Sequence, residues 1–467
     1  MGKWKSFLFV TVLGAIIWFI PVPDGLKPQA WHLLAIFVAT IVGVILQPLP
    51  MGAMALIGIT VCALTNTLTV PQSLSAFADA TIWLIVCAFL FARSFIKTGL
   101  GSRIAYMLMR SIGDSTLKLG YVLCISDLIL APATPSNTAR GGGVLYPIVR
   151  SLCSAFESEP GGASSRRIGA YLMVTQFQCN CITSAMFMTA MAANPLIAVL
   201  SKQVLKIDIS WGLWALAASV PGVVALIVMP LFLYKIFPPE LKHTPEAKEL
   251  ATRELDKRGP MTREEKIVLA VFIGALVLWA TSSFTKLNAT LVALMGVCVM
   301  LITEVLTWKD ILDDKGPWDT LMWMGGLVGM AGFLNTLGFI PWFAKTVSAS
   351  ISGIAWVPAL TILLIVYMYA HYGFASLTAH VTAMYPAFVA VAVAAGAPTF
   401  LAALSLAFLS NLCGGLTHYS TGTAPIYFGA GYVDQGTWWK LGFGASVVNM
   451  VIWIGVGGIW WKVLGLW

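Results

Sequence analysis

Residues 132–147, PATPSNTARGGGVLYP, place prolines, glycines and polar side chains between two long apolar runs. Pro132 and Pro135 cannot continue a helix, whereas Ser136, Asn137 and Thr138 belong to the residue types that cap the start of a new one. Irregular backbone at membrane depth is tolerated only where it is buried in protein or lines a water-filled cavity. The stretch therefore predicts a broken helix inside a membrane, and a helix start beside Arg140 is a site for an anion.

The composition also indicates a membrane protein. Of the 467 residues, 58% are hydrophobic and 10% are charged, against about 25% charged in a soluble globular chain. The mean hydropathy is +0.85. Because about 20 apolar residues cross the hydrocarbon as a helix, the apolar runs predict an all-α polytopic membrane protein with about eleven transmembrane helices and two re-entrant hairpins. The net charge of +8 lies largely in loops, where lysine and arginine set orientation, so no nucleic-acid partner is expected.

The pattern of the first stretch recurs in the second half of the chain. Ser136-Asn-Thr-Ala-Arg140 is echoed by Ser376-Leu-Thr-Ala-His380, and the Tyr-Pro pair at 146–147 by another at 385–386. Repeated halves, each with an interrupted helix that carries polar groups, indicate a secondary transporter whose site lies near the bilayer midplane. Residues 132–140 are called the first tip below, and residues 371–380 the second tip.

The predicted organisation is two inverted halves joined by a hydrophilic linker. If the N-terminal lysines are cytoplasmic, the other basic loops are cytoplasmic too, so the two hairpins enter the membrane from opposite sides. The ranges are scaffold helices at 1–79, a first-half transport region at 80–238 with its hairpin at residues 117–155, a cytoplasmic linker at 239–266, scaffold helices at 267–316, and a second-half transport region at 317–467 with its hairpin at residues 355–395. The first apolar run lacks a small-x-small cleavage site, and no transit peptide precedes it, which favours a bacterial inner membrane.

Hydroxyl groups recur in the helix that follows each hairpin. The segment 183–190, TSAMFMTA, aligns with the segment 417–424, THYSTGTA. Serine and threonine in transmembrane helices usually hydrogen-bond to a neighbouring helix or to their own backbone. Clusters of them beside two symmetric helix breaks nevertheless favour a binding site.

Two cationic side chains occupy equivalent places in the two tips. A cation at membrane depth is costly, so Arg140 faces the protein interior or a cavity, and by default it marks function. The alternative is an internal ion pair with Asp127, the carboxylate that lies deepest in an apolar run. His380 is the counterpart of Arg140. A lone histidine is usually a satisfied core residue, but the place of His380 on a symmetry-related tip favours a function.

The sequence does not indicate a metal site, a cofactor or an enzyme. The eight cysteines fall in or beside apolar segments, and Cys179-Asn-Cys181 has the wrong spacing for a zinc pair, so they are interpreted as reduced packing residues. An intramembrane serine protease would use Ser376 with His371, His380 or His418. That alternative is weak because residues 373–376, GFAS, have one residue too many for a Gly-x-Ser elbow.

Two motifs carry a family resemblance that extends over nearly the whole chain. Residues 135–150, PSNTARGGGVLYPIVR, closely resemble the first hairpin signature of the divalent-anion/sodium symporter family, and residues 417–428, THYSTGTAPIYF, resemble the motif of its exchanger branch. That branch includes plastid 2-oxoglutarate/malate translocators and bacterial citrate/succinate and tartrate/succinate antiporters. The resemblance implies a homodimer in membrane lipid, in which a mobile transport domain moves like an elevator against a scaffold.

In such families the Ser-Asn-Thr tips bind substrate carboxylates. Carried over here, the resemblance completes the set of candidate substrate-binding residues, which are Ser136, Asn137, Thr138, Thr183, Thr189, Ser376, Thr378, Thr421, Gly422 and Thr423. The second tip departs from the pattern because Leu377 stands where sodium-coupled members have asparagine. An apolar side chain there removes an oxygen ligand for sodium.

These residues lead to a hypothesis of obligate exchange. A dicarboxylate brings two negative charges into a low-dielectric site, so positive charge must accompany it. Arg140, which stays protonated, and a protonated His380 would replace co-transported sodium, and the empty carrier would then resist crossing. We therefore expect a dicarboxylate or tricarboxylate antiporter for substrates such as 2-oxoglutarate, malate, succinate or citrate, without a sodium requirement. The alternative is a sodium-coupled dicarboxylate symporter of the same family.

Overall fold

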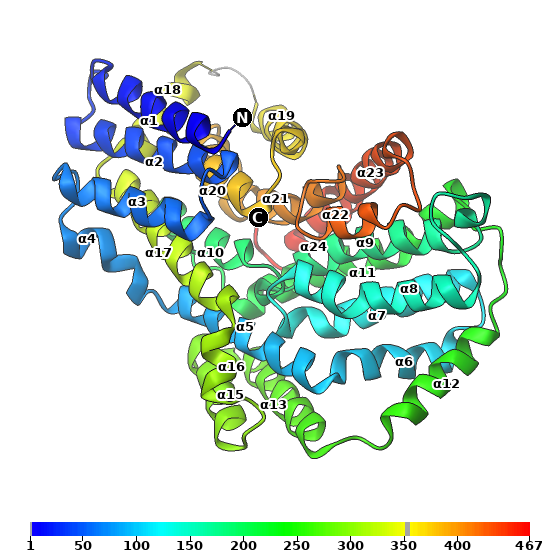
Figure 1. The fold of residues 1–467 in the computed structure, drawn as a ribbon. Coiled ribbons are helices and arrows are strands. Elements are labelled where there is room, and N and C mark those ends of the chain that lie inside the picture. Colours follow the sequence, from blue (N-terminus) through cyan, green and yellow to red (C-terminus); the bar gives the residue numbers. More distant parts are fainter. Residues whose placement is uncertain (1, 351–354) are drawn as a thin grey trace.

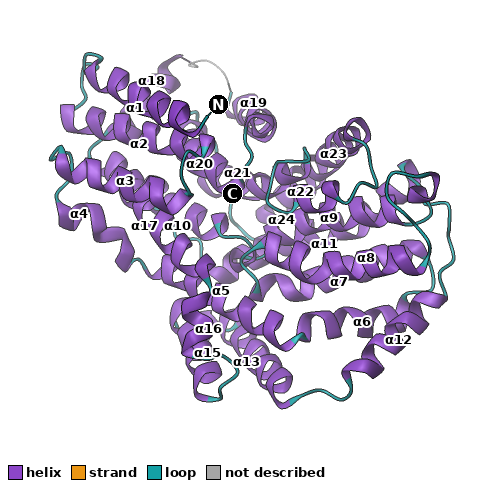
Figure 2. Ribbon diagram, viewed as in Figure 1, coloured by secondary structure: helices purple, strands orange, loops and turns teal. Residues whose placement is uncertain are grey.

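The computed structural model describes residues 2–350 and 355–467, and no β-strand occurs in these two ranges. The chain is built almost entirely of helices and short connections (Figure 2). Helices suit a membrane because they satisfy every backbone N–H and C=O within one segment. The predicted all-α fold is confirmed, and residues 351–354 of the predicted range 317–467 lie outside the described residues.

The first half of the chain contains eleven α-helices. They are α1 (Lys3–Phe19), α2 (Pro28–Leu46), α3 (Met51–Leu64), α4 (Val70–Leu74), α5 (Ala80–Thr98), α6 (Leu100–Ile112), α7 (Thr116–Leu130), α8 (Tyr146–Ala155), α9 (Gly169–Met186), α10 (Ala193–Leu205) and α11 (Trp211–Ile236). Short turns of other helix types, η1 (Ser75–Ala78), η2 (Ala131–Ala133), η3 (Ala139–Leu145), η4 (Ala163–Arg166) and η5 (Met188–Ala190), lie between them.

A connecting helix, α12 (Glu246–Arg258), precedes the second half. The second half contains α13 (Arg263–Ala280), α14 (Ser282–Thr285), α15 (Ala289–Ile302), α16 (Trp308–Asp313), α17 (Lys315–Thr336), α18 (Phe339–Ser350), α19 (Trp356–Ala370), α20 (Leu377–Ala394), α21 (Thr399–Leu412), α22 (Ala424–Gly429), α23 (Gln435–Met450) and α24 (Gly457–Val463). Its short turns are η6 (His371–Gly373), η7 (Cys413–Gly415) and the π-helical η8 (Val451–Val456).

Among the described residues, seven helices are long and apolar enough to cross a membrane, or eight if the bent pair of α17 and α18 is one span. Three further apolar helices, α3, α15 and the segment Thr399–Gly415, are shorter. Together they make an integral membrane protein. The count of about eleven membrane-spanning helices stays a prediction. It depends on counting the interrupted pair α9 and α10 as one crossing, and the pair α21 and α22 as another.

The helices before the first hairpin pack against their counterparts from the second half. Helix α17 contacts α2, α3 and α5, and α5 also contacts α15. Figure 1 shows α1–α4 and α17 towards one end of the molecule and α6–α8 towards the other. Lys97 at the end of α5 bonds Asp310 of α16 at 2.6 Å, and this hydrogen bond lowers the pKa of the Asp310 carboxyl to about 2. Helices α5 and α17 belong to the predicted transport regions 80–238 and 317–467, and the division into scaffold and transport regions stays a prediction.

The predicted linker at 239–266 is partly ordered against the first half. Helix α12 packs on α6, and Arg103 of α6 donates to Glu265 at 2.7 Å and to the carbonyl of Gly259 at 2.8 Å. Both members of this ion pair are buried. The linker therefore fastens the start of α13 to the amphipathic helix α6.

Membrane orientation can be tested by labelling single cysteines with a membrane-impermeant maleimide. The background is Cys298→Ser, which removes the exposed native thiol. Glu249→Cys lies in the linker and Thr285→Cys at the end of the short helix α14, and both positions are exposed. If the N-terminus is cytoplasmic, Thr285→Cys labels in intact cells and Glu249→Cys only after permeabilisation. The reverse pattern would contradict the predicted orientation.

Candidate functional site

The first tip is a break between α7 and α8. The chain leaves α7 through η2, runs without helical hydrogen bonding over residues 134–136, and resumes a helix that passes through the π-helical segment η3. Pro132 and Pro135 cannot donate the backbone bonds that a continuous helix needs. The hydroxyl of Ser136 accepts from the N–H of Ala139 at 3.1 Å, which is a helix cap. The predicted broken helix is confirmed.

Arg140 has an acceptor for every one of its N–H groups. Its Nε donates to Asp127 at 2.8 Å, and one terminal nitrogen donates to the carbonyls of Thr134 at 2.8 Å and Ala190 at 3.0 Å. The other terminal nitrogen donates to Ser184 at 2.9 Å and to Thr183 at 3.4 Å. A guanidinium has five N–H donors, so none is left for a ligand in this conformation.

The pair formed by Asp127 and Arg140 is fully buried and close to neutral. Both side chains have zero exposure. Asp127 also accepts from the amide of Asn180 at 3.1 and 3.2 Å and from the hydroxyl of Thr183. A buried ion pair is tolerated only when such additional hydrogen bonds satisfy both partners. The structure thus places Arg140 in the internal ion pair that was the alternative for this residue.

Thr189 ties the same tip to the helix break that follows α9. Its hydroxyl donates to the carbonyl of Pro132 at 2.6 Å and accepts from the indole N–H of Trp211 at 3.0 Å. Thr183 and Thr189, both predicted to bind substrate, therefore use their hydroxyls to hold the first tip. Their binding role stays a prediction, and their observed contacts are with the protein.

The second tip repeats the cap but not the ion pair. Ser376 accepts from the N–H of Ala379 at 3.3 Å at the start of α20. His380, the counterpart of Arg140, is fully buried and faces His371, with 2.9 Å between their Nδ1 atoms. Leu377 is buried and packs beside Gly414. No carboxylate accompanies His380 among the contacts of the described residues.

Two neighbouring residues of the 413–423 break join the two tips. The carbonyl of Ser420 lies 2.9 Å from Nε2 of His371 in the second tip. The hydroxyl of Thr421 accepts from the amide of Asn137 in the first tip at 2.9 Å. The first tip therefore contacts the break of the other half of the chain, in addition to residues of its own half such as Thr189.

The contacts continue along the 413–423 break. The hydroxyl of Thr423 lies 3.4 Å from Asn180 of α9. A side chain at Gly422 would collide with the hydroxyl of Thr138, so the tip approaches the break as closely as a glycine allows. The sequence showed that the two tips repeat each other and that segment 183–190 repeats in segment 417–424, but not that the first tip contacts the 413–423 break.

The candidate residues divide by accessibility. Five candidates are buried and make hydrogen bonds to other protein groups, so they hold the site together: Asn137, Thr183, Thr189, Thr421 and Thr423. The accessible members are half-buried or exposed, and they are Ser136, Thr138, Ser376, Thr378 and Gly422. These residues offer hydroxyls and helix-start N–H groups, which are donors suited to a carboxylate.

Sequence reasoning missed a pair of asparagines that support the breaks. The amide of Asn194 donates to the carbonyls of Ser184 at 2.7 Å and Phe187 at 2.9 Å, which the interruption after α9 leaves free. Asn411 of α21 donates to the side-chain oxygen of Asn194 at 2.7 Å. Asn194 and Asn411 each stand near the break of a helix that follows a hairpin, and that shared position was the available signal.

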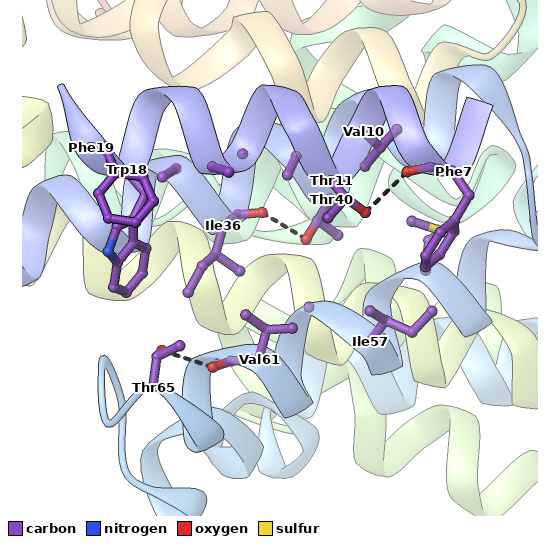
Figure 3. Close-up of a pocket in the computed structure, with 16 residues that line it drawn as sticks. Phe7, Val10, Thr11, Trp18, Phe19, Ile36, Thr40, Ile57, Val61 and Thr65 are labelled. Carbon is purple, nitrogen blue, oxygen red and sulfur yellow. Dashed lines mark hydrogen bonds between the residues drawn. The ribbon is translucent and has the colours of Figure 1, made fainter. Parts of the chain in front are cut away.

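An apolar cavity of about 350 Å³ lies elsewhere, between α1, α2 and α3 (Figure 3). The hydroxyls of Thr11, Thr40 and Thr65 point to it, but each donates to a carbonyl one turn earlier in its own helix. Its remaining lining is almost wholly apolar. Such a cavity offers nothing to a dianion, so the candidate site is the region of the tips.

Two broken helices that face polar breaks inside an all-helical membrane fold are typical of a membrane transporter rather than an enzyme. The comparison with known families agrees. The chain belongs to the divalent-anion/sodium symporter family, since the family model described as the sodium:sulfate symporter transmembrane region matches residues 1–467.

Known proteins resemble the chain over its whole length. It is 55% identical over 465 residues to “Putative malate transporter YflS” of Bacillus subtilis (strain 168), covering 100% of this chain and 97% of that protein. It is 50% identical over 465 residues to “Dicarboxylate transporter 1, chloroplastic” of Spinacia oleracea, covering 99% of this chain and 82% of the relative. The solved structure of MtrF from Neisseria gonorrhoeae shares the fold, with a TM-score of 0.60 at 13% identity over 98% of this chain and 94% of that one.

The ion pair predicts a specific pattern of stability. Arg140→Met leaves Asp127 buried without its cation, which costs about 3–5 kcal/mol, whereas an apolar replacement of both partners is often neutral. We therefore expect Arg140→Met to melt well below the wild type in detergent, and Arg140→Met with Asp127→Leu to recover most of the loss. Equal melting of the single and double variants would contradict the structural role of the pair.

The close approach of Gly422 to Thr138 predicts a loss of substrate affinity. Gly422→Ala places a methyl group against the Thr138 hydroxyl, and overpacking of this kind costs about 1–3 kcal/mol. We expect KM for the transported substrate to rise about tenfold or more. Gly429→Ala is the matched control, because a methyl group there meets nothing within 4 Å. Identical kinetics of the two variants would refute the contact.

Proposed function

We propose that this protein is a secondary active transporter that exchanges dicarboxylates, of the 2-oxoglutarate, malate and succinate type, or tricarboxylates such as citrate, across a membrane. The relatives named for malate and dicarboxylate transport support this substrate class. The accessible donors at the tips also support it, because they are neutral groups arranged at helix starts, where anions bind.

The observation that carries the proposal is the junction at residues 420–421. Ser420 contacts the second tip and Thr421 contacts the first, so two capped helix starts lie on either side of one short segment. A ligand with a carboxylate at each end fits this arrangement, with one carboxylate at each tip. Thr138 and Thr378 are the accessible hydroxyls on the first turn after each cap.

The second tip supports exchange without sodium. Sodium is held by carbonyl and hydroxyl oxygens, and the position after the cap is taken by Leu377, a buried apolar side chain beside Gly414. The family as a whole is described by sodium coupling, so the sodium-coupled dicarboxylate symporter remains the alternative function. The two functions differ in whether transport needs sodium and whether it needs substrate on the opposite side.

The hypothesis that Arg140 and His380 replace coupled sodium stays a prediction. In the present conformation Asp127 balances the charge of Arg140, so the direct contribution of Arg140 is to position the first tip. The finer features of the proposal are an elevator motion of the transport region, a homodimer, a bacterial inner membrane and a cytoplasmic N-terminus. They rest on the family resemblance and on loop charge.

Uptake into proteoliposomes tests the function directly. Labelled succinate, malate or 2-oxoglutarate is offered to vesicles that are empty or preloaded with unlabelled dicarboxylate, with and without sodium. We expect uptake only into preloaded vesicles and at equal rates in both media, because Leu377 removes an oxygen ligand for sodium. Gly429→Ala serves as a variant that retains activity.

Sodium-driven uptake into empty vesicles would refute exchange and establish the symporter. Arg140→Gln separates the roles of the arginine in the same vesicles. If the charge of Arg140 compensates the charge of the substrate, the Arg140→Gln carrier still binds substrate. It can also cross the membrane without substrate, so that labelled substrate accumulates in empty vesicles. If the arginine only positions the tip, the variant loses binding and transport together.

A further inference from the structure

Three side chains with metal-binding atoms meet behind the second tip. They are His371 of η6, His380 of α20 and Cys413 of η7, and all three are fully buried. The Nδ1 atoms of the histidines lie 2.9 Å apart, and the Cys413 sulfur lies 3.6 Å from Nδ1 of His380. Over residues 2–350 and 355–467, this is the one group of three such side chains whose ligand atoms all lie within 4.8 Å of one another.

The hydrogen bonds around His371 orient its lone pair into the cluster. A carbonyl oxygen can only accept, so the 2.9 Å contact with Ser420 places the proton of His371 on Nε2. Its Nδ1 then carries a lone pair directed at Nδ1 of His380. The 2.9 Å separation fits either a hydrogen bond donated by a protonated Nδ1 of His380 or a cation bound by both nitrogens. A bond from the second ring nitrogen to a backbone carbonyl is also how metal-bound histidines are usually oriented.

The distances are close to those of a zinc site. With Zn–N bonds of about 2.0 to 2.1 Å and a Zn–S bond of about 2.3 Å, tetrahedral zinc holds two nitrogens about 3.3 Å apart and a nitrogen and a sulfur about 3.5 Å apart. The observed values are 2.9 and 3.6 Å. The Cys413 sulfur and the free nitrogen of His371 lie within 4.8 Å of each other, and one ion bridges a nitrogen and a sulfur up to about 4.4 Å apart. Imidazole and thiolate together select zinc over magnesium or calcium.

We propose that His371, His380 and Cys413 bind one divalent metal ion of the zinc type. The three ligands leave a fourth position for water or a small anion, as in zinc sites with three protein ligands. The ligands come from the second tip and from the start of the 413–423 break, so the ion fastens one to the other. Metal binding is measured without transport, so its failure is distinguishable from failure of the proposed exchange.

Cobalt titration of the purified full-length protein tests the site. Co²⁺ replaces Zn²⁺ in such sites and gives visible bands of a tetrahedral ion together with a thiolate-to-cobalt band in the near ultraviolet. We expect both at one cobalt per chain, and their loss when Zn²⁺ is added. Cys413→Ser should abolish the thiolate band, and His371→Asn should weaken binding at least tenfold. Cys298→Ser, which changes an exposed cysteine instead, should change nothing.

Thermal melting of the same proteins controls for folding. Without metal, Cys413→Ser should melt as the wild type does. Zinc should raise the melting temperature of the wild type and of Cys298→Ser but not that of Cys413→Ser, because a ligand stabilises the state that binds it. If Cys413→Ser does not fold, the proposal is tested by comparing the cobalt spectra of the wild type and of His371→Asn. A wild type without a thiolate band in excess cobalt, or a Cys413→Ser protein that keeps the band, would overturn the proposal.

Discussion

The guanidinium of Arg140 lies in an apolar interior, and it is stable there because each of its N–H groups has an acceptor. Several of these acceptors are backbone or side-chain groups at points where helices break. Thr134 lies in the first tip and Ala190 in the interruption after α9, and their carbonyls lack helical partners. One guanidinium thus donates hydrogen bonds to free carbonyl groups of two helix breaks, and the carboxylate of Asp127 balances its buried charge. The irregular backbone at membrane depth depends on this interaction.

The second half holds its tip with histidine and aromatic side chains instead of an ion pair. Where Arg140 stands in the first tip, His380 packs against Tyr367 and Phe374, with ring centroids 4.4 and 5.0 Å away. The carbonyl oxygen of Ser420 accepts a hydrogen bond from Nε2 of His371, whereas the free carbonyls of the first half accept from a guanidinium. The two halves share their caps and hydroxyls, but they differ in how they hold the tip in place. An inverted repeat can therefore keep its backbone while its two ends acquire different chemistry.

Much of the fold and part of the site were predictable from the sequence. Prolines, cap residues and apolar runs act locally, so the first tip and the helix starts at Ser136 and Ser376 follow from residue type. The interruption after α9 was not predictable, because residues 187–192 contain neither proline nor glycine. That break is stabilised by distant groups, including Asn194. Contacts between halves, such as Asn137 with Thr421, depend on docking that spacing does not show.

The adjacency of Ser420 and Thr421 has a mechanical consequence. Consecutive Cα atoms are about 3.8 Å apart across a planar peptide bond, so a rotation of this one unit moves the partners of both tips together. If a ligand binds with one end at each tip, as proposed above, its two ends are thermodynamically linked, and ordering at one end lowers the entropic cost of ordering at the other. In the proposed site, a ligand that engages only one tip would therefore gain less than half the binding free energy of one that engages both. The junction therefore favours ligands by their length between charged ends as well as by their charge.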